Sequence, residues 1–165
     1  MGTSYMGESD YILLQKEEAS LLLKPIQSVF SKKNPLVFEI SCQIHCCDLE
    51  LLNIFLKVKA LEEVSVHKVA TQLNSLQDLE STHEDVRSSH QTFWTQVQVC
   101  GPQRLRAGKL YKWQSEISIP PNLNPTYRGY NASHEWSVML SLSAEKFASG
   151  TRITETNWMN IEIVD

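Results

Sequence analysis

The fold is decided by two adjoining stretches, LRAGKLYKWQSEISIPP at residues 105–121 and NLNPTYRGYNASHEWSV at residues 122–138. In the first stretch, Gly108 permits a tight turn, and the residues after it alternate between two faces. Trp113, Ile117 and Ile119 are expected to fill a core. Pro120 and Pro121 cannot donate a hydrogen bond to a neighbouring strand, so the strand must end before them. The first stretch therefore predicts a turn, a half-buried strand and a stop.

The second stretch predicts a turn followed by another strand. Pro125 lies in the turn, and Gly129 is expected to adopt a positive φ just before the next strand begins. From residue 136 the apolar residues again recur at every second position: Trp136, Val138, Leu140 and Leu142. This alternation is typical of a strand with one buried face.

The same period of two extends outward to other parts of the chain. It marks the segments 38–44, 54–59, 93–100 and 159–164, which are rich in Val, Ile, Phe and Trp. Two short strands are predicted at residues 11–15 and 19–23. Residues 17–23 and 49–61 are also compatible with helices on propensity, and the strand reading is favoured at 49–61 because of its Ile54, Leu56 and Val58 face.

The segment from residue 70 to residue 90 is the long polar stretch of the chain. Val69, Leu73, Leu76 and Leu79 recur at spacings of four and three, which is compatible with one short helix. Between residues 80 and 90 Val86 is the single apolar residue, so a mobile loop or a bowed sheet edge is expected there.

These patterns predict an all-β protein with an immunoglobulin-like antiparallel β-sandwich of about seven to eight strands. Residues 1–10 are expected to form a flexible leader, and residues 11–165 a single domain. The chain lacks the Cys…Trp…Cys pattern of antibody domains, since the one Trp between Cys42 and Cys100 is Trp94.

Residues 105–138 resemble the arrestin-like superfamily. The shared features are the glycine turn, the alternating strand that ends in proline, the proline-containing turn, and the glycine before the next strand. A looser match extends to residues 35–60. The superfamily includes arrestins, the arrestin-shaped retromer subunit and bacterial sporulation-control proteins, most of which carry two sandwiches. The resemblance implies an arrestin-like sandwich and a protein-binding or scaffold role; the phosphate-sensing lysines of true arrestins have no counterpart here.

Composition excludes several classes of protein. The chain has 15 basic and 19 acidic residues, a net charge of −4, so it lacks the basic character of a dedicated nucleic-acid binder. Its most apolar stretch is interrupted by charged residues and is too short for a transmembrane segment. The amino terminus has no signal-peptide pattern, and the adjacent Cys46 and Cys47 favour free thiols over disulfides. A cytoplasmic location is therefore expected.

Candidate chemical sites are weak. Cys42, His45, Cys46 and Cys47 form a cluster without a second pair of zinc ligands, so thiols packed as small apolar side chains are the favoured interpretation. No cofactor or metal is predicted. The 81–90 segment contains Ser81, His83, Glu84 and Asp85, which leaves a hydrolase as a weak alternative, but no nucleophile elbow or phosphate loop accompanies it.

The predicted site is a partner-binding turn at Tyr127, Arg128 and Tyr130, where aromatic and basic side chains cluster. An alternative reading is that the tyrosines simply cover the end of the sandwich. The expected function is a non-catalytic interaction or scaffold module that binds an unknown protein, with a weak homodimer through an edge strand as a further partner. A carbohydrate-binding or adhesive sandwich is the alternative, and Asn131 lies in a glycosylation sequon that would matter in that setting.

Overall fold

The computed structural model describes residues 12–27, 29–73, 79–147, 150 and 152–165, which form thirteen strands and no helix. One sheet has the order β1–β2–β4–β8; its strands are β1 (Ile12–Gln15), β2 (Ala19–Pro25), β4 (Leu36–Ile44) and β8 (Leu110–Ile117). The predicted leader at residues 1–10 lies outside the described residues.

The other sheet has the central order β11–β10–β5–β6. Its central strands are β11 (Ile153–Glu155), β10 (Ala132–Ala144), β5 (Leu49–Leu73) and β6 (Leu79–Cys100). Two short strands, β12 (Met159–Ile161) and β9 (Tyr127–Arg128), pair with β10, and a third, β7 (Gln103–Leu105), pairs with β5. A short parallel pair, β3 (Phe30–Ser31) and β13 (Ile163–Val164), lies at one end.

The core lies between the two sheets, as the alternation predicts. The inward residues of β4, β5 and β10 are almost fully buried: Leu36, Phe38, Ile40, Cys42, Ile44, Ile54, Leu56, Val58, Ala60, Trp136, Val138, Leu140 and Leu142. Ile117 and Ile119 are buried too, while Trp113 is partly buried at the margin of the core. The apolar faces of two sheets thus remove each other from water, which is the main source of stability for a sandwich.

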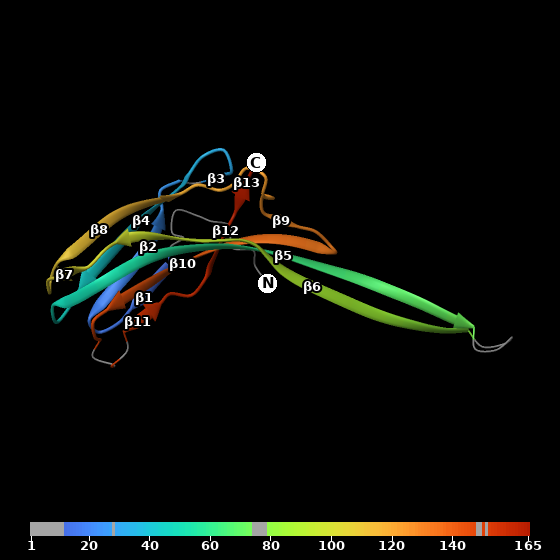
Figure 1. Cartoon of the computed structure of the whole chain (residues 1–165), viewed down its shortest axis with the longest axis horizontal. Coiled ribbons are helices and arrows are strands. Elements are labelled where there is room, and N and C mark those ends of the chain that lie inside the picture. The colour runs from blue at the N-terminus through green and yellow to red at the C-terminus, as the bar shows by residue number, and fades with distance from the viewer. Residues whose placement is uncertain (1–11, 28, 74–78, 148–149, 151) are drawn as a thin grey trace.

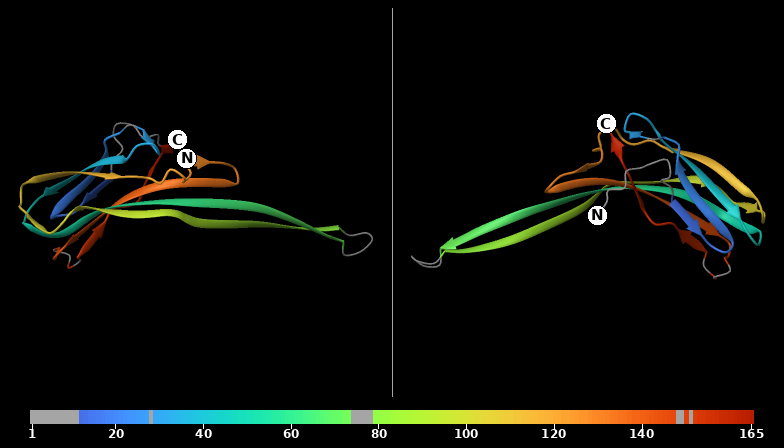
Figure 2. Two further views of the ribbon diagram at one scale, coloured as in Figure 1. Left: turned by 45° about the horizontal axis from the view of Figure 1, so that its top comes forward. Right: turned by 180° about the vertical axis from the view of Figure 1, so that it is seen from behind.

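Strands β5 and β6 continue well past the sandwich as a two-stranded ribbon (Figures 1 and 2). Strand β10 pairs with β5 only up to the register position Ala132–Val64, whereas β5 and β6 pair from Ile54–Cys100 to Leu73–Leu79. We call residues 65–73 and 79–87 the hairpin arm. Within the described residues, the arm has no third strand on either side.

The structure confirms the predicted all-β sandwich and the strands expected at its centre, including those at residues 19–23 and 49–61, where helices were considered. The helix expected in the polar segment is wrong where the structure describes it, since residues 69–73 and 79 lie in strands, and residues 74–78 lie outside the described residues. Of the two structures expected for residues 80–90, the sheet edge agrees with strand β6 and the mobile loop does not. The spacing of four between Val69 and Leu73 returns to the same side of a strand as well as of a helix, so these two residues did not discriminate between the two structures, and Leu76 of the same pattern lies outside the described residues.

Two further details differ from expectation. The prediction of seven to eight strands is too low because strands of two to four residues are too short to show a periodic pattern. The positive φ expected at Gly129 is not present, whereas Gly108, where a tight turn was expected, has a φ of 77°. A Cβ atom at Gly129 would instead lie 3.1 Å from the carbonyl oxygen of Ala132, so close backbone approach explains this glycine.

Candidate interaction site at the root of the hairpin arm

The predicted binding turn connects β9 to β10 and lies beside the root of the hairpin arm. The turn is closed by a hydrogen bond of 2.7 Å from the Gly129 amide to the Ala132 carbonyl. The Ser65 amide donates a bond of 2.7 Å to the Asn131 carbonyl, which attaches the turn to β5. Residues far apart in the sequence thus meet where the sandwich ends and the arm begins.

The three predicted site residues have different environments. The Tyr127 hydroxyl donates to the Glu62 carboxylate at 2.9 Å, and the Arg128 guanidinium forms an ion pair with Glu135 at 3.0 Å. The Tyr130 side chain is fully exposed. The first two therefore have intramolecular partners that hold the turn, while Tyr130 presents its whole ring to the surroundings.

Glu62 connects the turn to both strands of the hairpin. Besides Tyr127, its carboxylate lies 3.8 Å from the His90 ring nitrogen on β6. The hydrogen bond to Glu62 raises the pKa of Tyr127 above its ordinary value, because ionising the phenol would place two negative charges together. Tyr127 is thus held in its neutral, hydrogen-bonding form.

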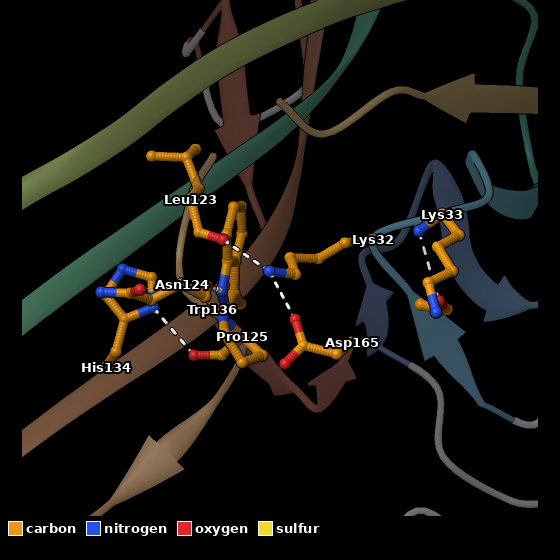
Figure 3. Close-up of polar contacts among 9 residues, drawn as sticks. Lys32, Lys33, Leu123, Asn124, Pro125, His134, Trp136 and Asp165 are labelled. Atoms are coloured by element: carbon orange, nitrogen blue, oxygen red, sulfur yellow. Dashed lines mark hydrogen bonds and ion pairs between the residues drawn. The ribbon is translucent and has the colours of Figure 1, made fainter. Parts of the chain in front are cut away.

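A fully buried histidine supports the turn from behind. His134 stacks on Tyr127 with ring centroids 6.0 Å apart and meets Trp136 edge-on at 5.6 Å. Its Nδ1 faces the Pro125 carbonyl oxygen at 3.2 Å, so Nδ1 carries the hydrogen (Figure 3). Its Nε2 then accepts from the Thr92 hydroxyl at 2.7 Å. Both ring nitrogens are satisfied, as burial of a polar group requires.

The proline-containing loop before β9 is held by hydrogen bonds from the side chains of Trp136 and Lys32 (Figure 3). The Trp136 indole donates to the Asn124 carbonyl at 3.1 Å, and the Lys32 ammonium donates to the Leu123 carbonyl at 3.0 Å. Lys32 also pairs with Asp165 at 2.5 Å. These bonds satisfy loop carbonyls and fix the approach to the turn.

A groove with a volume of about 380 Å³ lies between the turn and the root of the arm. Its lining combines polar and apolar atoms from β5, β6 and the turn; the residues are Glu63, Val64, Ser65, Arg87, Ser88, Ser89, Gly129, Tyr130, Asn131, Ala132 and Ser133. We call this the root groove. It joins Tyr130 to the arm, and it contains both a carboxylate and a guanidinium.

The site predicted from sequence includes Tyr130 but none of the groove residues on the hairpin. Glu63, Ser65 and Arg87 lie in a polar stretch without apolar alternation, so no local pattern distinguished them. Their placement depends on the cross-strand register, in which Ser65 pairs with Arg87 and Glu63 with Ser89. Only the pairing of β5 with β6 brings these residues to the turn.

The cysteines are free thiols in three different environments. Cys42 is buried in the core, Cys46 and Cys47 are exposed, and Cys100 is half-buried. Burial raises the pKa of the Cys42 thiol to about 12, with a smaller contribution from Cys100. Within the described ranges, no three His, Cys, Asp or Glu side chains are arranged to hold a metal ion.

The two sheets, their strand order and the buried faces between them define an arrestin-like β-sandwich. Among solved structures, the chain is similar to Spo0M, the sporulation control protein from Bacillus subtilis, with a TM-score of 0.58 and 12% sequence identity. The similarity covers 88% of this chain and 49% of Spo0M, so the chain spans about half the length of that protein. At this identity the similarity demonstrates a shared fold.

No family model matches the chain, and neither does any curated protein. Within the described residues there is no helix that could cross a lipid bilayer.

Proposed function

We propose that this protein is a non-catalytic, cytoplasmic protein-interaction module of the arrestin-like type, which binds its partner at the root groove through Tyr130. The observation that carries the proposal is the full exposure of a tyrosine ring at the rim of a groove. Tyrosine is enriched among residues that dominate binding energy, because it offers a large rigid ring and a polar end.

The surrounding contacts support a preformed site. Tyr127 and Arg128 are held by Glu62 and Glu135, and the buried His134 supports the turn, so little ordering is needed when a partner binds. Tyr127 and Arg128 thus act in positioning, and Tyr130 acts in contact. The free thiols agree with a reducing compartment.

The test is site-specific photocrosslinking in cells that naturally express the protein. A benzophenone amino acid replaces Tyr130, and the matched control carries it at Leu110, an exposed apolar residue on the other sheet. We expect a discrete protein adduct from position 130 and none from position 110. With the purified partner, Tyr130→Ala should weaken binding by about tenfold or more, as for a hot-spot residue.

A glycan-array experiment addresses the carbohydrate-binding alternative. Specific glycan binding that is lost in Tyr130→Ala, together with the absence of any protein adduct, would replace the interaction-module proposal with a carbohydrate-binding one. The hydrolase alternative depended on a loop at residues 81–90, and that segment is a strand in which Asp85 bonds His67 at 2.6 Å.

A further inference from the structure

Strand β8 forms one edge of the sheet β1–β2–β4–β8 and lies along the outer margin of the sandwich (Figure 1). Within the described residues its one partner strand is β4. The Ile44 amide donates to the Lys109 carbonyl at 3.0 Å, so these two residues are a hydrogen-bonded pair of the antiparallel ladder. Such pairs recur at every second residue, which assigns the odd-numbered residues of β8 to β4. The backbone groups of the even-numbered residues therefore face away from β4: Leu110, Lys112, Gln114 and Glu116.

The side chains along this edge leave it open to another chain. Those of the four even-numbered residues are exposed, whereas the odd-numbered residues between them are half-buried or buried. On the inner face, the rings of Tyr111 and Trp113 stack with centroids 6.1 Å apart and stay only partly buried at the margin of the core. An edge with free backbone groups and incompletely covered aromatic rings is a template for strand pairing.

The charged residues of the edge are placed symmetrically about Gln114. Lys112 precedes Gln114 by two residues, and Glu116 follows it by two. If two copies of β8 pair antiparallel with a twofold axis at Gln114, Lys112 of each copy lies directly opposite Glu116 of the other. Opposite charges across a strand pair are stabilising, and like charges are destabilising.

Other antiparallel registers of β8 with itself lack this match. Hydrogen bonding at the free edge requires even-numbered residues to face even-numbered ones. An axis at residue 112 places two lysines opposite each other, and an axis at residue 116 places two glutamates opposite each other. An axis at residue 113 or 115 leaves Lys112 opposite a neutral side chain, that of Gln114 or Ser118. Among these registers, charge complementarity selects the one centred on Gln114.

A lysine on an edge strand usually discourages pairing with another chain. Here the Lys112 ammonium lies 3.7 Å from the Glu39 carboxylate on β4, and both side chains are exposed. Glu116 has no ion pair within the part of the chain that the structure describes. An ammonium has three donors, so Lys112 can keep its contact with Glu39 and also donate to Glu116 of a second copy.

We propose that two copies of this protein associate through β8, antiparallel and with the twofold axis at Gln114, which joins their two sheets into one continuous sheet. Residues 111–117 of each copy pair in this register, and Leu110 lies outside it because its opposite position, residue 118, is beyond the end of β8. One strand pair is a small interface, so the dimer is weak and forms as the protein concentration rises. No residue of the root groove belongs to this sheet, so the inference is independent of the proposed function.

Disulfide trapping tests the register in the full chain. The exposed Cys46 and Cys47 are first replaced by serine. In that background Gln114→Cys places two thiols opposite each other, with Cα atoms about 5.5 Å apart, a separation that a disulfide spans. The matched control is Leu110→Cys, an exposed position on the same strand whose two copies would lie about 27 Å apart along the pair. We expect a disulfide-linked dimer from Gln114→Cys under mild oxidation and none from Leu110→Cys.

A charge exchange tests the chemistry of the pairing. Lys112→Glu places two glutamates opposite each other on both sides of the axis, and adding Glu116→Lys restores both opposite-charge pairs in reverse. Both variants lose the contact with Glu39, so the difference between them isolates the contact between copies. We expect Lys112→Glu to raise the dimer Kd by about tenfold or more and the double variant to return it to within about threefold of the wild-type value. Sedimentation equilibrium from about 1 μM to about 1 mM protein measures the Kd, and circular dichroism verifies that each variant is folded.

The dimer proposal fails if the wild-type chain stays monomeric up to the highest concentration. It also fails if Lys112→Glu does not weaken the dimer, or if adding Glu116→Lys does not restore it. A disulfide that forms as readily from Leu110→Cys as from Gln114→Cys would reject the register centred on Gln114. If Tyr130 crosslinks to a different protein in any of these cases, the proposed function stands and only the dimer inference fails.

Discussion

Strands β5 and β6 pass through two different environments, and the contrast separates the region that stabilises the fold from the region that we propose binds a partner. Between Ile54 and Ala60 the inward side chains of β5 are fully buried beneath the opposite sheet, and β10 pairs alongside. Farther along the same strand, Val66 is 47% exposed, and within the described residues neither a facing sheet nor a third strand is present. The pairing of β5 with β6 continues through both regions.

Cross-strand hydrogen bonds set the path of the hairpin in both regions, but a two-stranded ribbon is at best marginally stable in water on those bonds alone. In the sandwich, burial of apolar area adds the larger favourable term. That term is small for the arm side chains that the structure describes, such as Val66, so the conformation of the arm depends more on the contacts at its root. Stability and binding are thus assigned to different parts of the same two strands.

The largest expected effect comes from removing buried volume in the sandwich half of β5. Leu56→Ala should lower the free energy of unfolding by about 2–5 kcal/mol, because it removes a fully buried side chain and leaves a cavity. Val66→Ala, in the arm, should change it by about 0.5 kcal/mol or less. Urea unfolding followed by tryptophan fluorescence measures both. Equal losses at the two positions would contradict the division between sandwich and arm.

The junction between the two regions should show an intermediate effect. Thr92→Val removes the hydroxyl that donates to Nε2 of the buried His134 and leaves that nitrogen without its bond. We expect a loss of about 1–3 kcal/mol in unfolding free energy, the cost of an unsatisfied buried polar group. Thr92→Ser keeps the hydroxyl and serves as the control. Thr92→Val keeps the methyl group of Thr92, so a loss in Thr92→Val no larger than that in Thr92→Ser would mean that the hydroxyl bond to His134 contributes little to stability.

Removing the arm should affect stability less than either change. The Ser65 amide bonds Asn131 on the β10 side, so the neighbouring Val66–Val86 pair is the one that is hydrogen-bonded across the hairpin, and residues 67–85 can be replaced by an Asn-Gly turn that suits a two-residue hairpin. The free energy of unfolding should change by about 1 kcal/mol or less, a scale typical of surface changes. Calorimetry and denaturant unfolding measure this. A loss of several kcal/mol would show that the arm is part of the cooperative core.

The same division explains which features could be predicted from sequence. In the sandwich, burial on one face imposes a period of two, so the strands containing Phe38, Ile54 and Trp136 were predicted correctly. In the arm, residues on both faces such as Val66, His67 and Glu84 are exposed where the structure describes their side chains, so burial imposes no apolar alternation, and residues 80–90 were predicted as a mobile loop or a bowed sheet edge. The absence of Gly and Pro from residue 36 to residue 100 also removed the usual turn signals.

The candidate site was predictable only in part, for a related reason. Tyr130 stands in a turn marked by Gly129, and local sequence was enough to find it. Its neighbours Ser65 and Arg87 come from the arm, and their position follows from a long-range register that no local pattern encodes. Glu62 was missed because its partner Tyr127 is distant in sequence and the bond forms only after the sheet assembles.

The smallest expected effect is a pH dependence of the contact that ties the turn to the arm. The hydrogen bond to Glu62 raises the pKa of Tyr127 above its ordinary value of 10, so the folded state favours the neutral phenol. The stabilisation from this group is fully present below that ordinary value and is lost as the pH rises through the raised folded pKa.

Tyr127→Phe lacks both the bond and the titration. The difference in unfolding free energy between the wild-type protein and Tyr127→Phe should therefore be constant from neutral pH to about pH 9 and shrink at higher pH. Tyr130→Phe is the control because the ring of Tyr130 is fully exposed. Urea unfolding across this range measures the difference. A difference that stayed constant into strongly alkaline solution would mean that the Tyr127–Glu62 bond does not link the turn to the root of the arm.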